Sequence, residues 1–470
     1  MFIISSKFLN EVKRLANKRI VLCFLMAFDI LFCIVNIFKQ LLLVGAIFLL
    51  LNFLYILVSN KKNIFYLLFF LYPLARVLKF PNFGTSILTI LLALSYFIFA
   101  ARFFVKKEKL TKPKLITSIL FGLYVLLTLI VSFINKGFEL NALLSYYLYL
   151  AYPFIAFAII KNDNELDGTN NLIFCMTSYL IGILITIVFY KIIPNGSAML
   201  TRIGVKIFEM GTAGIRFTPL TDDPNYGAAL ILLIGCIFII AKKTKRQKTV
   251  GYPILLSCFG LSCLSLSKMF IGCIVILFFC WLISFMFKTK SLIINSSLLL
   301  FVVIGIIVFL SSSFGTSLII RTIGTTDGIS LNRITSGRTD IFGEYSSYIL
   351  SKPLALLFGK GPLFVDESTF SAGEHNTFTK NVFGSGLIGV TIMLVAFYIM
   401  MQNRFDKIKE FPKNSYFVGL ILCLLICCMS LGIAPSTVFP IFVVAFQFTI
   451  IDNTSVHSVL LSSVWEEITI

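Results

Sequence analysis

Charged side chains are scarce in this sequence. Asp, Glu, Lys and Arg make up 13% of its 470 residues, whereas hydrophobic residues make up 58% and the mean hydropathy is +0.96. A soluble domain carries about 25% charged residues, because surface-to-volume scaling requires a polar shell. The scarcity of charge therefore argues against a soluble enzyme or a disordered chain and predicts a polytopic membrane protein.

Histidine and several sequence signatures are also scarce or missing. The chain has 2 histidines, and it contains no zinc, iron or Walker arrangement and no nucleotide-binding fingerprint. We therefore expect no metal and no cofactor. The 11 cysteines all fall within long apolar runs, so we expect no disulfide framework.

Long apolar runs, in contrast, are abundant. A membrane-spanning helix needs about 20 mostly apolar residues, and the sequence predicts an all-α protein with about 14 transmembrane helices (range 12–14). The third run contains Pro73 and Arg76 and is expected to bend or to be partly re-entrant. The predicted spans are Ile20–Phe38, Leu41–Val58, Ile64–Phe80, Thr85–Phe104, Leu115–Ile134, Leu143–Ile160, Leu172–Tyr190, Tyr226–Ala241, Val250–Leu266, Met269–Phe287, Leu292–Leu310, Phe378–Met401, Tyr416–Gly432 and Val438–Ile451.

The positive charge is uneven along the chain. There are 40 Lys and Arg residues against 21 Asp and Glu, a net charge of +19. In a soluble protein this excess would suggest nucleic acid, but most basic residues here lie in short loops on one predicted side. The positive-inside rule makes that side cytoplasmic, together with both termini. We therefore expect a lipid bilayer and no nucleic acid as partner.

This topology divides the chain into five parts. Residues 1–190 hold the N-terminal transmembrane helices, 191–225 the first extracytoplasmic loop and 226–310 the central helices. Residues 311–377 form a large extracytoplasmic loop, and 378–470 hold the C-terminal helices and a cytoplasmic tail. The large loop is nearly neutral and is expected to be partly helical, with an amphipathic helix from Asp340 to Leu350 that Lys352-Pro353 ends.

Two polar motifs flank the central spans. Arg216 precedes Asp222–Asn225, which reads as the capped start of a helix, with Pro224 at its entry. Arg216 is either the ligand of an anion, for which its planar donors are suited, or the partner of Asp222 or Asp223 in an ordinary loop. Lys268 follows Ser267 between two spans that almost touch, where it is either an anion ligand or a lysine that reaches the membrane surface.

The large loop carries the remaining candidates. Ser336-Gly337-Arg338 precedes its predicted helix, a glycine turn at Gly359 and Gly361 follows, and the loop closes on Glu374-His375-Asn376. His375 is either structural or a general base for a hydroxyl group, because a neutral imidazole accepts a proton. Beyond it, Gly384, Gly386 and Gly389 thin one helix face and permit close packing.

An acid also lies within the first predicted span. Asp29 is a candidate functional residue because ionisable groups inside membranes are costly, but its own segment offers no partner.

Taken in order, these motifs resemble the O-antigen polymerase and ligase superfamily, in particular Wzy-type capsular and exopolysaccharide polymerases. The likeness spans about residues 200–400 and rests on Arg216 with Asp223–Asn225, Ser267-Lys268, Ser336–Arg338, Pro353 with Gly359 and Gly361, and His375-Asn376 with Gly386 and Gly389. The family has an arginine where Lys268 stands, so a bidentate contact is not expected there.

The resemblance implies a GT-C-like membrane glycosyltransferase in the bacterial cytoplasmic membrane. Such a polymerase transfers a growing glycan from undecaprenyl diphosphate to the next lipid-linked repeat unit, with inversion and without a metal. It implies Arg216 and Arg338 as stabilisers of the diphosphate, His375 as the base, and Lys268, Asn225, Asn376 and Glu374 as substrate-binding residues. A chain-length regulator and a flippase are the implied partners.

Other functions remain open. A ligase of the same superfamily would transfer the glycan to a different acceptor, and a shape-determining cell-wall polymerase or a non-catalytic scaffold are further alternatives. A polysaccharide flippase also has about fourteen spans. It would keep charged residues inside the helical bundle, whereas the polar residues here collect in two long loops.

Overall fold

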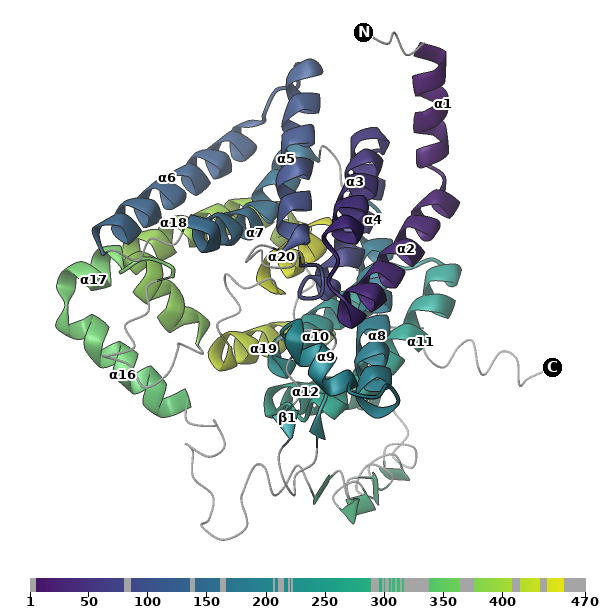
Figure 1. The fold of residues 1–470 in the computed structure, drawn as a ribbon. Coiled ribbons are helices and arrows are strands. Elements are labelled where there is room, and N and C mark those ends of the chain that lie inside the picture. Colours follow the sequence, from purple (N-terminus) through teal and green to yellow (C-terminus); the bar gives the residue numbers. More distant parts are fainter. Residues whose placement is uncertain are drawn as a thin grey trace.

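The structure is a computed structural model, and it describes most of the chain. Described are residues 6–79, 86–135, 140–160, 166–205, 208–209, 215–218, 220, 223–288, short pieces between 296 and 316, 338–363, 376–407, 415–431 and 438–451. Within these residues the fold is almost entirely helical, with one two-stranded antiparallel sheet in which Phe208 pairs with Arg216. Figure 1 labels these elements. In chain order they are α1 (Ser6–Ala16), α2 (Arg19–Phe38), α3 (Leu42–Val58), α4 (Lys61–Leu71), η1 (Tyr72–Leu74), α5 (Ile87–Val105), α6 (Lys112–Ile134), α7 (Leu140–Ile159), α8 (Gly168–Lys191), α9 (Gly196–Arg202), β1 (Phe208–Glu209), β2 (Ile215–Arg216), α10 (Pro224–Ile240), α11 (Lys245–Ser262), η4 (Cys263–Ser265), α12 (Lys268–Lys288), α16 (Arg338–Ser351), α17 (Pro353–Phe358), α18 (Thr377–Lys407), α19 (Ser415–Ser430) and α20 (Val438–Phe448).

The predicted spans coincide with helices, but many of these helices are shorter than a bilayer requires. Every predicted span except Leu292–Leu310, which lies mostly outside the described residues, overlaps a helix. Within the described part, 6 helices are long and apolar enough to cross a membrane, and five more are apolar but shorter. The helical, membrane-embedded class is thus supported, whereas the predicted number of fourteen spans is not confirmed.

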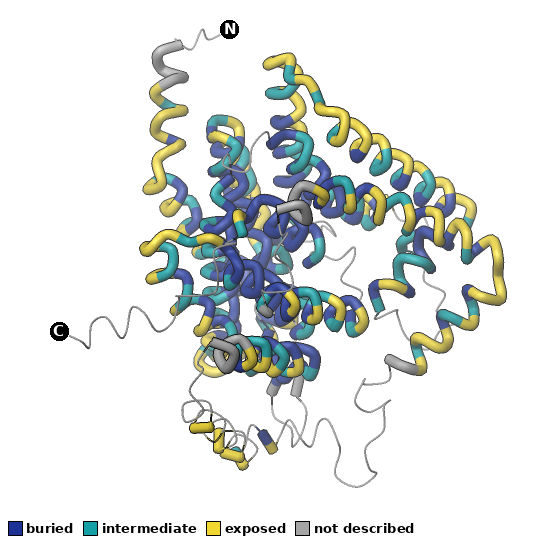
Figure 2. Tube along the Cα trace, turned by 180° about the vertical axis from the view of Figure 1, so that it is seen from behind, coloured by how far each residue is buried: buried dark blue, intermediate teal, exposed yellow. Residues whose placement is uncertain are grey.

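Short helices occupy the centre of the bundle. α4 is buried from Asn63 to Leu71, and α20 is buried at every residue except Phe439, which is partly buried. Figure 2 shows this buried centre surrounded by helices with exposed outer faces. α4 ends in the turn η1 at Pro73, because proline cannot donate the next helical hydrogen bond. The third predicted span, Ile64–Phe80, is therefore interrupted at Pro73.

The peripheral helices expose an apolar face. On α6 this face includes Leu115, Ile119, Leu123, Leu126 and Ile130, each at least 48% exposed. Residues three and four positions apart lie on the same side of a helix, so these side chains form one continuous stripe. Monomeric soluble proteins rarely leave so large a contiguous apolar surface in water, and the stripe supports a lipid-facing position.

Basic residues gather at one end of the bundle, where they cap helices. The Arg102 guanidinium donates to the carbonyl groups of Ser59 (2.8 Å) and Leu57 (2.8 Å) at the end of α3. Lys61 donates to Ile159 (2.6 Å), and Lys114 donates to Ala158 (3.1 Å), both at the end of α7. Cations at helix C-termini satisfy unpaired carbonyls and oppose the helix dipole. We call this end, defined by Arg102, Lys61, Lys114 and Lys242, the basic end.

The large loop packs on one side of the bundle through glycines. Its predicted helix is α16, which ends at Ser351, just before Lys352-Pro353, as expected. Pro353 also begins a further helix, α17, which the sequence did not predict. α17 lies against α18, which packs along α6, and these helices stand to one side of α8 and α10–α12 (Figure 1). After α17, the Lys360 N–H donates to the Phe383 carbonyl (2.7 Å) and the Gly361 N–H donates to the Gly384 carbonyl (2.9 Å). The expected close packing at these glycines is therefore confirmed.

Gly386 makes this contact possible. Its φ of +65° and ψ of 178° interrupt the helix, and a Cβ at this position would overlap the Leu357 carbonyl group. Such a backbone conformation is essentially restricted to glycine. The kink in α18 thus opens the carbonyls of Phe383 and Gly384 to the loop.

Asp29 has a partner on the neighbouring helix. The Asn52 side-chain amide on α3 donates to Asp29 Oδ1 on α2 (3.0 Å), and both side chains are fully buried. The second carboxyl oxygen and the Asn52 side-chain oxygen make no hydrogen bond within the described part of the chain. The pair joins α2 to α3 and leaves two buried acceptors in apolar surroundings.

We expect Gly386→Ala to destabilise the protein by about 1–3 kcal/mol, the cost of one strongly disfavoured backbone conformation. Gly122→Ala on α6 is the matched control, because nothing lies within 4 Å of the place that its Cβ would take. Thermal unfolding in detergent measures both variants. Equal melting temperatures for the two variants would contradict the role of Gly386.

Asn52→Leu should destabilise the protein by about 1–3 kcal/mol, because it leaves the buried Asp29 carboxyl without its donor. The double variant Asp29→Leu/Asn52→Leu should recover much of this loss, since it removes both polar groups. A double-mutant cycle of unfolding free energies tests the pair. Strictly additive effects would show that the two side chains do not interact.

Candidate functional site at the Arg216 end

The β1–β2 hairpin carries Arg216 to the ends of the central helices. After β2, the Phe217 N–H donates to the Leu264 carbonyl in η4 (3.1 Å), and the Phe217 ring contacts Tyr190 near the end of α8. We call this region, where α8 and α11 end and α10 and α12 begin, the Arg216 end. Because α8, α10 and α11 run between the two regions, the Arg216 end lies opposite the basic end.

The Arg216 guanidinium connects its own motif to the turn that precedes Lys268. Its Nε donates to the Ser265 carbonyl (2.7 Å), and its Nη2 donates to Asn225 Oδ1 (3.0 Å). The residue is only 7% exposed. Charge-assisted hydrogen bonds of this kind hold geometry strongly. Arg216 therefore fixes the start of α10 relative to the end of α11.

Asn225 is held from a second direction. Asp223 is the N-cap of α10, and its carboxylate accepts a hydrogen bond from the Asn225 N–H (2.6 Å). Pro224 occupies the first helical turn, where its missing N–H costs nothing. The capping role predicted for Asp222–Asn225 is confirmed at Asp223 and Pro224, whereas Asp222 lies outside the described residues. This start of α10 aims the Asn225 side-chain oxygen at Arg216.

The turn between α11 and α12 presents Lys268. Leu266 has a φ of +47°, and the buried Ser267 hydroxyl accepts a hydrogen bond from the Phe270 N–H (3.4 Å). Lys268 is the first residue of α12 and is partly buried. The turn that accepts the Arg216 hydrogen bond therefore also carries this lysine, so the two polar motifs that flank the central spans meet here.

The candidates of the large loop lie on other elements. Arg338 begins α16, whose described contacts are with α17 and α18, and its side chain is outside the described part. Glu374 and His375 also lie outside the described residues. Asn376 caps α18: its side-chain oxygen accepts from the Phe378 N–H (2.8 Å), and its amide donates to the Met429 carbonyl (3.3 Å). Through these two contacts, Asn376 positions the start of α18 against α19.

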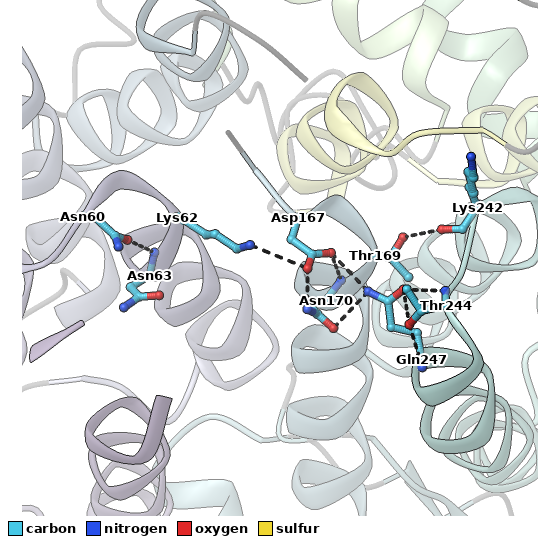
Figure 3. Close-up of polar contacts among 9 residues, drawn as sticks. All are labelled: Asn60, Lys62, Asn63, Asp167, Thr169, Asn170, Lys242, Thr244 and Gln247. Carbon is cyan, nitrogen blue, oxygen red and sulfur yellow. Dashed lines mark hydrogen bonds and ion pairs between the residues drawn. The ribbon is translucent and has the colours of Figure 1, made fainter. Parts of the chain in front are cut away.

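Sequence reasoning missed a polar cluster at the basic end. There Asp167 at the start of α8 lies 3.7 Å from Lys62 on α4 and accepts a hydrogen bond from Gln247 on α11 (3.2 Å) (Figure 3). In the sequence, the basic members of this cluster indicate only topology. The capping signals at Asp167 and Thr244 are readable there, but nothing in the sequence shows that the two helix starts meet.

The arrangement at the Arg216 end offers fixed positive charge and hydrogen-bond donors. In the described part of the chain, no group of three His, Cys, Asp or Glu side chains is placed to hold a metal ion.

No family model matches the sequence, and no curated protein is significantly similar to it.

Arg216→Lys should destabilise the protein by about 1–3 kcal/mol, because a lysine cannot make both contacts with Ser265 and Asn225. Arg246→Lys, an exposed change at the basic end, should have no measurable effect. Thermal unfolding of both variants measures the difference. A fully stable Arg216→Lys protein would show that the two-point contact does not hold this site.

Proposed function

We propose that the protein is a membrane glycosyltransferase that polymerises lipid-linked oligosaccharide repeat units. The donor is the growing glycan on undecaprenyl diphosphate, and the acceptor is the next lipid-linked unit. The reaction takes place on the extracytoplasmic side of the bacterial cytoplasmic membrane, and the Arg216 end faces that side.

The proposal rests on the polar junction at the Arg216 end. Arg216, Asn225 and the Ser265–Lys268 turn are far apart in sequence, yet they form one connected polar junction at an end of an apolar bundle. These are the first two motifs on which the family resemblance rests. A polar junction at the membrane boundary suits a substrate with a lipid tail and a charged diphosphate.

The chemistry requires one bond to form as another breaks. A hydroxyl group of the acceptor attacks C1 of the donor sugar from the face opposite the lipid diphosphate. The C1–oxygen bond to the diphosphate breaks, the lipid diphosphate leaves with the electron pair, and the hydroxyl proton passes to a base. Negative charge grows on the leaving group, so fixed cations lower the barrier.

The roles of the residues divide between binding and positioning. Arg216 already donates to Ser265 and Asn225. We therefore assign to it mainly the role of holding the junction in place, and only secondarily the binding of the diphosphate. Lys268 and Arg338 are the proposed diphosphate ligands. His375 is the proposed base, with Glu374 or Asn376 orienting it, and Asn225 and Asn376 are assigned to the binding of the glycan.

The experiment supplies the purified protein in nanodiscs with lipid-linked repeat units extracted from cells that lack it. Wild-type protein should convert these units to longer lipid-linked glycans and release undecaprenyl diphosphate. His375→Ala should slow elongation by about 10²–10⁴-fold, the usual contribution of a general base. Arg338→Ala and Arg338→Lys should both lose elongation activity if the contact of Arg338 with the diphosphate is bidentate.

Lys109→Ala is the matched control, because Lys109 is exposed on the loop after α5 at the basic end. It should retain wild-type chain lengths. Normal chain lengths with both His375→Ala and Arg338→Ala would overturn the proposal. Transfer of the glycan only to a different acceptor would identify a ligase, and translocation without elongation would identify a flippase.

A further inference from the structure

A cavity of about 340 Å³ opens at the basic end, among the starts of helices α8 and α11 and the ends of α10 and α20. Ligand sites in proteins typically measure about 300–1,000 Å³, so its size suits a small ligand or a headgroup. Its lining residues are Lys62, Leu166, Asp167, Gly168, Thr169, Lys242, Lys243, Thr244, Gln247 and Ile450. None of them belongs to the Arg216 end.

The cavity is shaped by contacts that fix the backbone around it. The Thr169 hydroxyl donates to the Lys242 carbonyl (3.1 Å), and the Lys242 N–H donates to the Ile450 carbonyl (2.7 Å). A Cβ at Gly168 would lie 2.6 Å from the Phe448 carbonyl oxygen, so glycine lets the end of α20 approach α8. The chain around Lys242 is thus held by the start of one helix and the end of another.

The lining is positively charged. Lys62, Lys242 and Lys243 contribute three cations, and among the described lining residues Asp167 is the acid. Lys243 donates to the carbonyls of Phe238 (2.7 Å) and Ala241 (2.6 Å) at the end of α10, so it is a fixed charge in the wall. Lys242 is exposed and makes no ion pair within the described part of the chain. Its side chain extends away from Lys62 and Asp167 (Figure 3), so it must turn to reach an anion beside them.

The charge of Asp167 is largely engaged by the protein itself. Its carboxylate caps α8 by accepting from the Asn170 N–H (3.2 Å), and it accepts from Gln247 Nε2 (3.2 Å) (Figure 3). Lys62 lies 3.7 Å from it, with a side chain 37% exposed. An ion pair of this length contributes little free energy when the lysine is partly hydrated. The Lys62 ammonium can therefore turn toward a second anion in the cavity.

Two helix N-termini add to the field. α8 begins beside the cavity behind Asp167, and α11 begins there behind Thr244, whose hydroxyl and Gln247 form a capping box. The positive ends of both helix dipoles lie beside the cavity, and they favour an anion. Leu166 and Ile450 supply an apolar edge next to the polar centre.

We propose that this cavity binds a phosphate group, with Lys62 and Lys242 as its ligands. A phosphodiester in the headgroup of an anionic phospholipid is one source of that group, and a free phosphate from solution is the other. Basic pockets between membrane helices are suited to such headgroups. The site is separate from the proposed glycosyl transfer, since it lies at the opposite end of α8, α10 and α11.

The test measures thermal unfolding of the purified full chain in phosphatidylcholine nanodiscs. One arm adds phosphatidylglycerol to the nanodiscs, and the other adds inorganic phosphate against chloride at equal ionic strength. Stabilisation in the first arm alone identifies a lipid headgroup, and stabilisation in the second identifies free phosphate. Either result supports the proposal, and stabilisation in neither arm overturns it.

Variants separate a bound phosphate from general attraction to charge. Lys62→Gln and Lys242→Gln should each weaken the apparent affinity about tenfold, the loss of one charge-assisted hydrogen bond. Lys109→Gln makes the same charge change at an exposed position of the same end and should leave the affinity unchanged. Equal losses in all three variants would overturn the assignment to this cavity.

Asp167→Asn provides a test of opposite sign. Asparagine caps a helix as well as aspartate does, so α8 should remain intact while the competing negative charge is removed. The affinity for the phosphate probe should therefore rise. A fall in affinity with unchanged thermal stability would contradict the proposed site.

Discussion

Unpaired backbone groups at helix ends are the constraint on which this structure depends. A helix in apolar surroundings satisfies its interior hydrogen bonds, but its first N–H groups and last carbonyls need other partners. Here the chain supplies them from basic side chains and from caps. Arg102 and Lys114 donate to the last carbonyls of α3 and α7, respectively. Asp167, Asp223 and Thr244 are the N-caps of α8, α10 and α11, respectively. The polar chemistry is thereby concentrated at the two ends of the bundle.

The helix ends are capped differently at the two ends of the bundle. At the Arg216 end, the guanidinium of Arg216 is buried and shared between Ser265 and Asn225, so the junction is stiff. At the basic end, Lys62 and Lys242 remain partly hydrated around a cavity. A stiff junction suits the alignment of reacting groups, whereas adaptable lysines suit the capture of a phosphate. The same capping demand thus underlies both proposals.

The helical class and the positions of most helices follow from the apolar runs, because those runs are long and their limits are marked by charge. The break at Pro73 and the packing at Gly384 and Gly386 are also predictable, since proline and glycine act locally. The Asn52 partner of Asp29 and the meeting of Lys62 with Asp167 are not. Each joins segments from different helices, and one sequence contains no signal for which helices become neighbours. The β1–β2 hairpin escapes prediction because two-residue strands have no periodicity to detect.

The proposed reaction and the proposed phosphate site place the Arg216 end and the basic end on opposite sides of the membrane. Lys109 lies on the loop after α5 at the basic end, and Asn195 lies between α8 and α9 at the Arg216 end; both positions are exposed. The variants Lys109→Cys and Asn195→Cys therefore report on the two sides. A maleimide that does not cross membranes, applied to intact cells, should label Asn195→Cys above the level of the unsubstituted protein and leave Lys109→Cys at that level until the cells are opened. Labelling of Lys109→Cys in intact cells would show that the basic end does not face the cytoplasm and would contradict both proposals.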